Sequence, residues 1–219
     1  MSTTSEENYI KTIFKLSPQF KQGVSTGSIA EYLSTKASSV TDMIKKLAEK
    51  ELVNYKKYQG VTLTGKGKDI AVKIVRKHRL WELFLYKSLG FKWDEIHEIA
   101  EQLEHIKSDL LIERLDRFLG YPHNDPHGDP IPDEKGNFQK IDSFLLTQLK
   151  AGCKGVVLGV NDKSSSFLTY LDKIGIHPGT ELEILEWFEF DNSADIKIDN
   201  FKSVHLSYQA VQNILMIEK

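Results

Sequence analysis

Apolar residues in the first fifty positions recur three and four places apart, which is the spacing of one helix face. Residues 6–16, 25–33 and 40–50 each carry such a stripe and predict three helices, the first with Ser5 as its N-cap. Residues 55–63 alternate around a glycine and predict two short strands joined by a turn. Two helices joined by a polar turn and followed by a hairpin are typical of a winged helix-turn-helix.

The pattern changes twice in the rest of the chain. A continuous apolar stripe predicts a long helix over residues 67–89, and helical periodicity continues through 94–103 and 103–119. Residues 120–132 are rich in proline and glycine and are incompatible with a regular element. Between residues 151 and 219, apolar and polar positions alternate in short runs that predict strands. The predicted fold class is therefore mainly α, with a small β domain.

Charge divides the chain into two parts. The sequence has 29 Lys and Arg against 31 Asp and Glu, but residues 1–80 hold 15 basic and 7 acidic side chains. Residues 81–219 hold 14 basic and 24 acidic side chains. The basic part suits a polyanionic partner, and the acidic part suits cations or a solvated surface.

A basic winged helix predicts binding to double-stranded DNA, with the helix of residues 40–50 in the major groove. Short polar side chains that suit base edges and phosphates lie at the start of this helix: Ser38, Ser39, Thr41 and Asp42. Ammonium groups that suit phosphate oxygens follow in the helix and the hairpin: Lys45, Lys46, Lys56 and Lys57. The alternative is an ordinary solvated face, but the hairpin and the basic balance favour DNA binding.

Several other classes are disfavoured. The sequence has no run of 18 apolar residues that could span a membrane, and its first residues lack the basic and apolar regions of a signal peptide. Cys153 is the only cysteine, which excludes an intramolecular disulfide and a cysteine-based zinc cluster. We therefore expect a cytoplasmic protein without a membrane partner.

Imidazole and carboxylate side chains recur at ligand spacing in the middle of the chain. Four of them are expected on one helix face: His97, Glu101, Glu104 and His105. His78 and Glu82 form a further pair, four residues apart. These side chains are metal ligands by type and spacing, although the same pairs are common on solvated helices. Two such groups on neighbouring helices favour a metal site.

The proline-rich residues 120–132 carry an unusual density of the same chemistry. His123, Asp125, His127 and Asp129 all lie within this stretch. They are consistent with a further group of ligands and equally with a rigid polar tether, and composition alone does not choose between the two.

The stretch from Tyr9 to Pro132 resembles the metal-dependent transcriptional repressors typified by the diphtheria toxin repressor and the manganese transport regulator. The resemblance is carried by ENYIKTIFKL, SSVTDMIKKLAEKELV, the hairpin around Gly60, RKHRL at residues 76–80, and ExxEHxxSD from Glu101. The sequence GIHPGTELEI near residue 175 is similar to the SH3-like β domain found in some members. The resemblance implies a DNA-binding domain over residues 1–73, a helical metal-binding and dimerisation domain with its linker over 74–141, and an SH3-like β barrel over 151–219.

The family resemblance also implies a function and a main metal site. It implies a homodimer that binds a palindromic operator and represses metal-uptake genes when Mn(II) or Fe(II) is abundant. The ligands would be Glu101, Glu104 and His105, with His78 and a residue of the first helix at the position of Asn8. Members carry Asp or Met at the position of Asn8. Lys11 stands where the manganese regulator has a second acidic ligand, and an ammonium group cannot serve as one.

A second site is implied for members with the β domain. Its ligands would be Glu82, Asp125, His127 and Asp162. An alternative grouping of His78, Glu82 and His97 would need ligands near Lys163 and Ser166, which disfavours it. All of these ligands are oxygen or imidazole, so Mn(II) or Fe(II) is expected in cells, and Zn(II) is expected to bind in vitro.

Two other classes of function remain open at this point. A metallohydrolase could use Glu101, Glu104 and His105 with a bound water, although no separate general base accompanies them. A DNA-architectural protein would bind DNA equally with or without metal.

Overall fold

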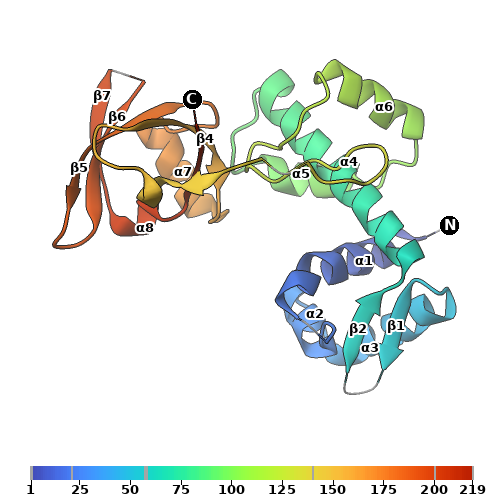
Figure 1. Cartoon of the computed structure of the whole chain (residues 1–219). Helices are drawn as coiled ribbons and strands as arrows, with labels where there is room; N and C mark the ends of the chain where they lie inside the picture. The colour runs from blue at the N-terminus through green and yellow to red at the C-terminus, as the bar shows by residue number, and fades with distance from the viewer. Residues whose placement is uncertain (1, 21, 57–58, 140, 200, 219) are drawn as a thin grey trace. The chain divides into compact units, whose positions relative to one another are not determined.

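The computed structural model of the chain describes residues 1–219 except 1, 21, 57–58, 140, 200 and 219 (Figure 1). It divides into two compact units. The first unit comprises Met1–His78, Leu103–Lys107 and Pro132–Asn137, and the second comprises Arg79–Gln102, Ser108–Ile131 and Phe138–Lys219. Helix α4 (Gly65–Leu89) contributes residues to both units.

The first unit contains a winged helix-turn-helix, as predicted. Its elements are α1 (Thr4–Leu16), the 3-10 helix η1 (Ser17–Gln19), α2 (Thr26–Tyr32), α3 (Ala37–Glu49), β1 (Val53–Lys56) and β2 (Gly60–Leu63). The two strands pair antiparallel, with Val53 opposite Leu63. The apolar stripes of the three helices meet in one core with Val61 of the hairpin, because each helix turns its buried face toward the others.

Two boundaries in this unit differ from the sequence prediction. The predicted N-cap Ser5 is wrong: Thr3 caps α1, and its hydroxyl accepts the N–H of Glu6 while the Glu6 side chain accepts the N–H of Thr3. Helix α3 begins at Ala37, three residues before its predicted start. The residues that were expected to lead into the helix therefore form its first turn.

The predicted helical stretch of residues 94–119 is interrupted by a turn. Helix α5 (Ile96–Leu103) is followed by a turn and then by α6 (Asp109–Phe118). The Ser108 hydroxyl accepts the N–H of Leu111 and so starts α6 as a separate helix. The prediction that His97, Glu101, Glu104 and His105 share one helix face is therefore wrong, because the last two lie in the turn after α5.

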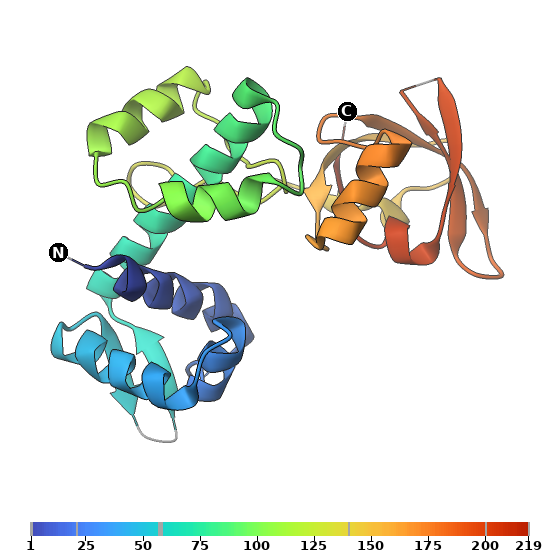
Figure 2. The same cartoon turned by 180° about the vertical axis from the view of Figure 1, so that it is seen from behind.

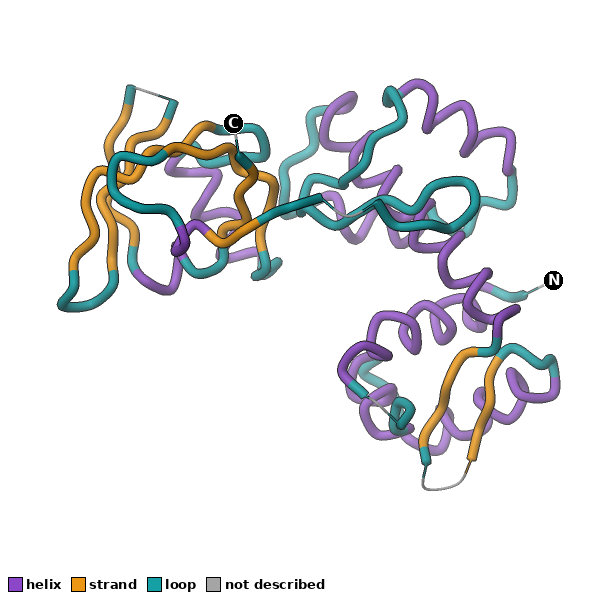
Figure 3. Tube along the Cα trace, in the orientation of Figure 1, coloured by secondary structure: helices purple, strands orange, loops and turns teal. Residues whose placement is uncertain are grey.

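Residues 144–217 form the predicted small β domain (Figures 2 and 3). Its elements are β3 (Phe144–Leu145), the 3-10 helix η2 (Leu146–Gln148), β4 (Lys154–Val160), α7 (Ser165–Ile174), β5 (Glu181–Phe188), β6 (Ser193–Ile198), β7 (Lys202–Leu206), α8 (Tyr208–Val211) and β8 (Ile214–Ile217). The strands form one antiparallel sheet in the order β3-β8-β4-β5-β6-β7. Leu168 and Leu171 of α7 are buried with the apolar positions of the strands. No helix in the described part of the chain is both long and apolar enough to cross a bilayer.

Candidate metal centres

The first group of potential ligands joins α1 to the turn after α5, within the first unit. We call it the α1 cluster, and it consists of Glu7, Asn8, Lys11, His78, Glu104 and His105. The Nδ1 atom of His105 lies 2.7 Å from Oε2 of Glu7. The Nδ1 atom of His78 lies 2.6 Å from Oε2 of Glu104, whose side chain is fully buried. The sequence places these residues in three separate elements, and the fold brings their polar atoms together.

Two features of the α1 cluster bear on metal binding. The amide oxygen of Asn8 is buried and accepts no hydrogen bond from the described residues. An amide oxygen is a suitable ligand for a hard divalent cation. The second feature is Lys11, whose Nζ atom lies 2.5 Å from Oε1 of Glu104. The ligand set fits a metal, and it already contains one positive charge.

Glu101 was expected beside Glu104 and His105 as a ligand of the main site. It lies on α5, where its Oε1 atom is 3.5 Å from Nε2 of His97. This helix pair follows the predicted spacing of four residues.

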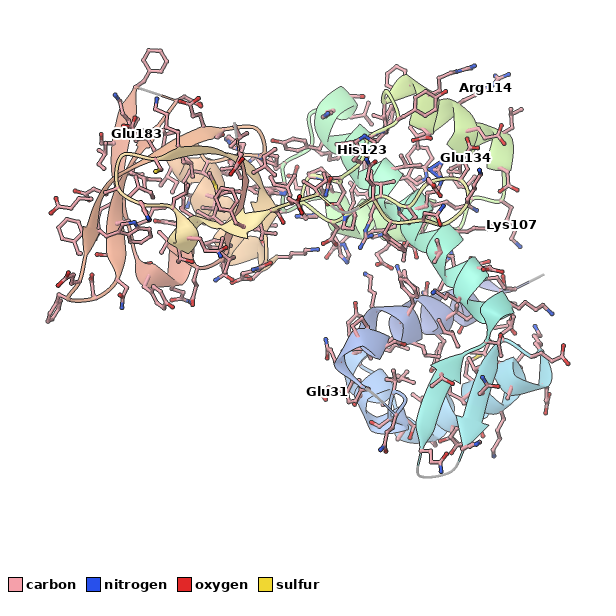
Figure 4. All side chains as sticks on the ribbon, viewed as in Figure 1. Glu31, Lys107, Arg114, His123, Glu134 and Glu183 are labelled. Carbon is pink, nitrogen blue, oxygen red and sulfur yellow. The ribbon has the colours of Figure 1, made fainter. Side chains whose placement is uncertain are left out.

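The second group of potential ligands lies within the second unit, where α4 and α5 meet the proline-rich linker. We call it the linker cluster, and it consists of Glu82, His97, Asp125 and His127. The Oε1 atom of Glu82 lies 3.1 Å from Nδ1 of His97 and 3.8 Å from Nε2 of His127. Glu82, Asp125 and His127 are all buried. In contrast, His123, labelled in Figure 4, is exposed, and its backbone carbonyl accepts the N–H of Ile131.

Backbone groups hold the linker in place. One carboxylate oxygen of Asp125 accepts the N–H groups of His127 and Asp129, at 2.8 and 3.0 Å. Such local hydrogen bonds fix a tight loop, as expected both for a preformed ligand group and for a rigid polar tether. The imidazole of His127 stacks on Trp93 with ring centroids 6.0 Å apart. Its backbone carbonyl accepts the N–H of Val160, the last residue of β4.

The hydrogen bonds that fix the loop do not involve two buried polar atoms of this cluster. Oδ2 of Asp125 and Nδ1 of His127 form no hydrogen bond with the described residues. Burial, together with the nearby charges of Glu82 and Asp129, raises the pKa of Asp125 well above its ordinary value, although Arg79 opposes this. Burial lowers the pKa of His127 to about 4, so its imidazole is neutral near pH 7, which is the form that binds metals. These properties fit a divalent cation.

The environment of the linker cluster includes an ion-pair network around Asp129 that the sequence did not predict. Asp129 accepts hydrogen bonds from Arg79 at 3.2 Å and from Lys163 at 2.6 Å. Asp162, the expected fourth ligand, accepts the N–H of Ser164 at 2.9 Å. No periodicity links Asp129 to Lys163, because 34 residues separate them.

The residues predicted to bind DNA lie on α3 and the hairpin. Most of them are exposed: Ser38, Ser39, Asp42, Lys45 and Lys56. The hydroxyl of Thr41 donates to the Ala37 carbonyl, and Lys46 forms an ion pair with the buried Glu6 at 3.0 Å. Lys57 lies outside the described residues.

The fold and the two clusters define a class of protein: a winged-helix DNA-binding protein with carboxylate and imidazole groups that suit divalent cations. Three family descriptions match the chain in succession. They are the iron dependent repressor N-terminal DNA binding domain at residues 1–61, the iron dependent repressor metal binding and dimerisation domain at 64–133, and the FeoA domain at 144–217.

Individual relatives agree with these matches. The transcriptional regulator MntR of Bacillus subtilis is 38% identical over 125 residues, which is 57% of this chain and 87% of that protein. The iron-dependent repressor IdeR of Mycobacterium tuberculosis is 33% identical over 128 residues, 58% of this chain and 54% of that protein. A structure of a manganese-dependent transcriptional repressor in complex with manganese has a TM-score of 0.77 and 37% identity, and the match covers 98% of this chain and 100% of that one.

The chain belongs to the iron-dependent repressor family, the metal-dependent transcriptional repressors of the MntR and IdeR type. It therefore binds DNA, carries a dimerisation domain, and is a regulator rather than an enzyme. The metallohydrolase alternative has no support in this family.

Proposed function

We propose that the protein is a homodimer that represses metal-uptake genes by binding a palindromic operator when Mn(II) or Fe(II) occupies both clusters. The observation that carries the proposal is a pair of buried oxygen atoms that accept no hydrogen bond from the described residues: Oδ1 of Asn8 and Oδ2 of Asp125. Buried polar atoms are seldom left unsatisfied, because each costs about 1–3 kcal/mol. A cation at each cluster would satisfy them.

In the α1 cluster, the metal would be held by Asn8, Glu104 and His105, with His78 and Glu7 beside them. Glu101, which the family resemblance implies as a further ligand, stays a candidate for the same ion. When bound, the ion supplies positive charge between the carboxylates. Glu7 and Asn8 belong to the first helix of the DNA-binding domain, whereas Glu104 and His105 belong to the turn after α5. Ligands from both elements would hold α1 in one position, which we take to be the DNA-binding arrangement. Metal can strengthen DNA binding only by as much as it binds this arrangement more tightly than the others.

In the linker cluster, Glu82, Asp125 and His127 would hold the metal, with Asp162 as the fourth ligand. The position of His97 beside Glu82 also makes it a candidate. The backbone hydrogen bonds to Asp125 fix the loop before metal arrives, so that little ordering is needed on binding. The N–H of Val160 holds the carbonyl of His127 and thereby links this ligand to the β domain.

The ligand chemistry favours hard cations. The donors are carboxylate, amide and imidazole groups, and none is a thiolate, which supports Mn(II) or Fe(II) as the effector. The manganese in the related repressor complex supports the same choice. Zn(II) is expected to bind in vitro because affinity rises along the divalent series.

Operator binding by the purified protein tests the proposal. Binding would be measured at fixed salt with Mn(II), Fe(II), Zn(II) or a chelator, because the electrostatic part of DNA affinity depends on salt. Mn(II) or Fe(II) should strengthen binding, and Glu104→Ala and His105→Ala should abolish that gain. Glu113→Ala, on the exposed face of α6, is the matched control and should behave as wild type. Unchanged metal-dependent binding by Glu104→Ala would contradict the proposal.

The same assay can test whether the operator is palindromic. A duplex with both half-sites should bind far more tightly than one with a single half-site, because both subunits contribute contacts. Equal affinity for the two duplexes would contradict a dimer on a palindromic site while leaving metal dependence intact.

A further inference from the structure

We infer that Lys11 is a built-in cation of the α1 cluster, so that this cluster takes a single divalent ion and keeps part of its connection between α1 and the turn after α5 when no metal is bound. The inference rests on the proposed function, in which the α1 cluster holds metal. It adds a residue that limits how many ions the cluster can accept.

The position of Lys11 is the first observation. It lies one turn after Glu7 and on the same face of α1, and only 4% of its surface is exposed. A lysine on a surface helix ordinarily extends its ammonium into water, because burying an unpaired charge is strongly unfavourable. The buried ammonium of Lys11 is therefore held by its surroundings.

The partner of Lys11 is the second observation. The Nζ atom lies 2.5 Å from Oε1 of Glu104, and the side chain of Glu104 has no exposed surface. The other oxygen of Glu104 lies 2.6 Å from His78. Both oxygens of this carboxylate are thus engaged: Oε1 by Lys11, with Nε2 of His105 at 3.7 Å, and Oε2 by His78. A metal ion held by Glu104 would therefore share this carboxylate with the ammonium of Lys11.

The charges of the cluster give the same conclusion. With neutral imidazoles, Glu7 and Glu104 bring two negative charges, and Lys11 compensates one of them. One divalent ion then leaves the group with a small net charge. A second divalent ion would have to approach both the first ion and the ammonium in a buried space, where repulsion is weakly screened.

The ion pair also joins two elements that the metal is proposed to join. Lys11 belongs to α1 and Glu104 to the turn after α5. Without metal, the pair Lys11–Glu104 and the pair His105–Glu7 still connect these elements. Metal therefore strengthens an existing connection at this cluster and does not create it.

Calorimetric titration of the full chain with MnCl2 tests the number of ions. A His127→Ala background removes a ligand of the linker cluster, so that the α1 cluster is titrated alone. We expect one equivalent of Mn(II) with Lys11 present and two equivalents in the Lys11→Glu variant, because a carboxylate replaces the ammonium. Lys15→Glu, one turn further along α1, makes the same change in net charge and should keep one equivalent.

Thermal melting separates a built-in cation from a merely structural ion pair. In Lys11→Gln the charge is lost, so the melting temperature in chelator should fall, and Mn(II) should raise it by more than it raises that of wild type. Removing the positive charge should also tighten Mn(II) binding by about tenfold. A structural role alone would lower both melting temperatures equally and leave the rise caused by Mn(II) unchanged. This variant also decides the matter if Lys11→Glu does not fold.

The outcomes distinguish this inference from the function on which it rests. If Glu104→Ala in the same background leaves the single Mn(II) equivalent in place, the α1 cluster is not a metal site and the proposed function fails there. If Glu104→Ala removes that equivalent but Lys11→Glu still binds only one ion, the inference about Lys11 is wrong and the proposed function stands.

Discussion

The two clusters differ in which groups contact their buried carboxylates. In the α1 cluster, side chains compensate one another: Lys11 pairs with Glu104, and His105 pairs with Glu7. In the linker cluster, backbone N–H groups engage one oxygen of Asp125 and leave the other without a hydrogen bond from the described residues. That oxygen forms an ion pair with the Nε atom of Arg79 at 3.6 Å, which is longer than a hydrogen bond.

This difference indicates which cluster depends more on metal. Compensated charges are stable without a ligand, whereas a buried carboxylate with a raised pKa is unfavourable until a cation or a proton arrives. We therefore expect metal to stabilise the protein more at the linker cluster than at the α1 cluster. In the α1 cluster, ion pairs already offset part of the buried charge.

Asp125→Asn should have the largest effect, and its two consequences have opposite signs. An amide keeps the acceptor for the N–H groups of His127 and Asp129 but removes the negative charge. The Mn(II) affinity of the linker cluster should therefore fall by more than about a hundredfold. In chelator, the variant should melt about 2–6 °C higher than wild type, because a buried neutral amide costs less than a buried carboxylate whose pKa is raised. Calorimetry and thermal melting measure the two effects.

Asp133→Asn provides the matched control for this change. Asp133 also accepts backbone N–H groups, from Lys135 and Asn137, but it is exposed. Its substitution should alter neither the metal affinity nor the melting temperature by a comparable amount. If Asp125→Asn melted lower than wild type in chelator, the carboxylate would be adequately compensated, and the contrast between the clusters would be lost.

Gly159→Ala should have an intermediate effect that acts through the backbone. A Cβ atom at Gly159 would overlap the carbonyl of His127, whose position is also fixed by the N–H of Val160. The linker must shift, so Mn(II) binding at this cluster should weaken by about tenfold to a hundredfold, as for other residues that position ligands. Gly65→Ala, where a Cβ atom meets nothing within 4 Å, is the control. Wild-type affinity in Gly159→Ala would show that the backbone does not position His127.

Much of the fold follows from local pattern. The helices of the first unit and the strands around Leu182 and Ile196 were predicted from apolar spacing, because one face of each element is buried. The boundaries were less accurate, since they depend on single hydrogen bonds. The side chains of Thr3 and Ser108 set the starts of α1 and α6, and apolar spacing carries no information about such caps.

The sites were predictable in residue type but not in arrangement. The density of His and Asp in the linker indicated ligands, and it could not tell the exposed His123 from the buried His127. Lys11 was recognisable as a residue that cannot bind metal. Its contact with Glu104 was not, because 93 residues separate the two and no local pattern encodes that distance.

Lys163→Gln should have the smallest effect and completes the comparison of the two clusters. Lys163 is the lysine beside the linker cluster, as Lys11 is in the α1 cluster, but its pair with Asp129 is 42% and 38% exposed. Exposed ion pairs contribute about 0–1 kcal/mol, so the melting temperature should fall by less than about 4 °C. The Mn(II) affinity should change by less than about fivefold, because water already screens the ammonium. A loss as large as that in Asp125→Asn would mean that Lys163 helps to hold the ligands, and that both clusters rely on a lysine.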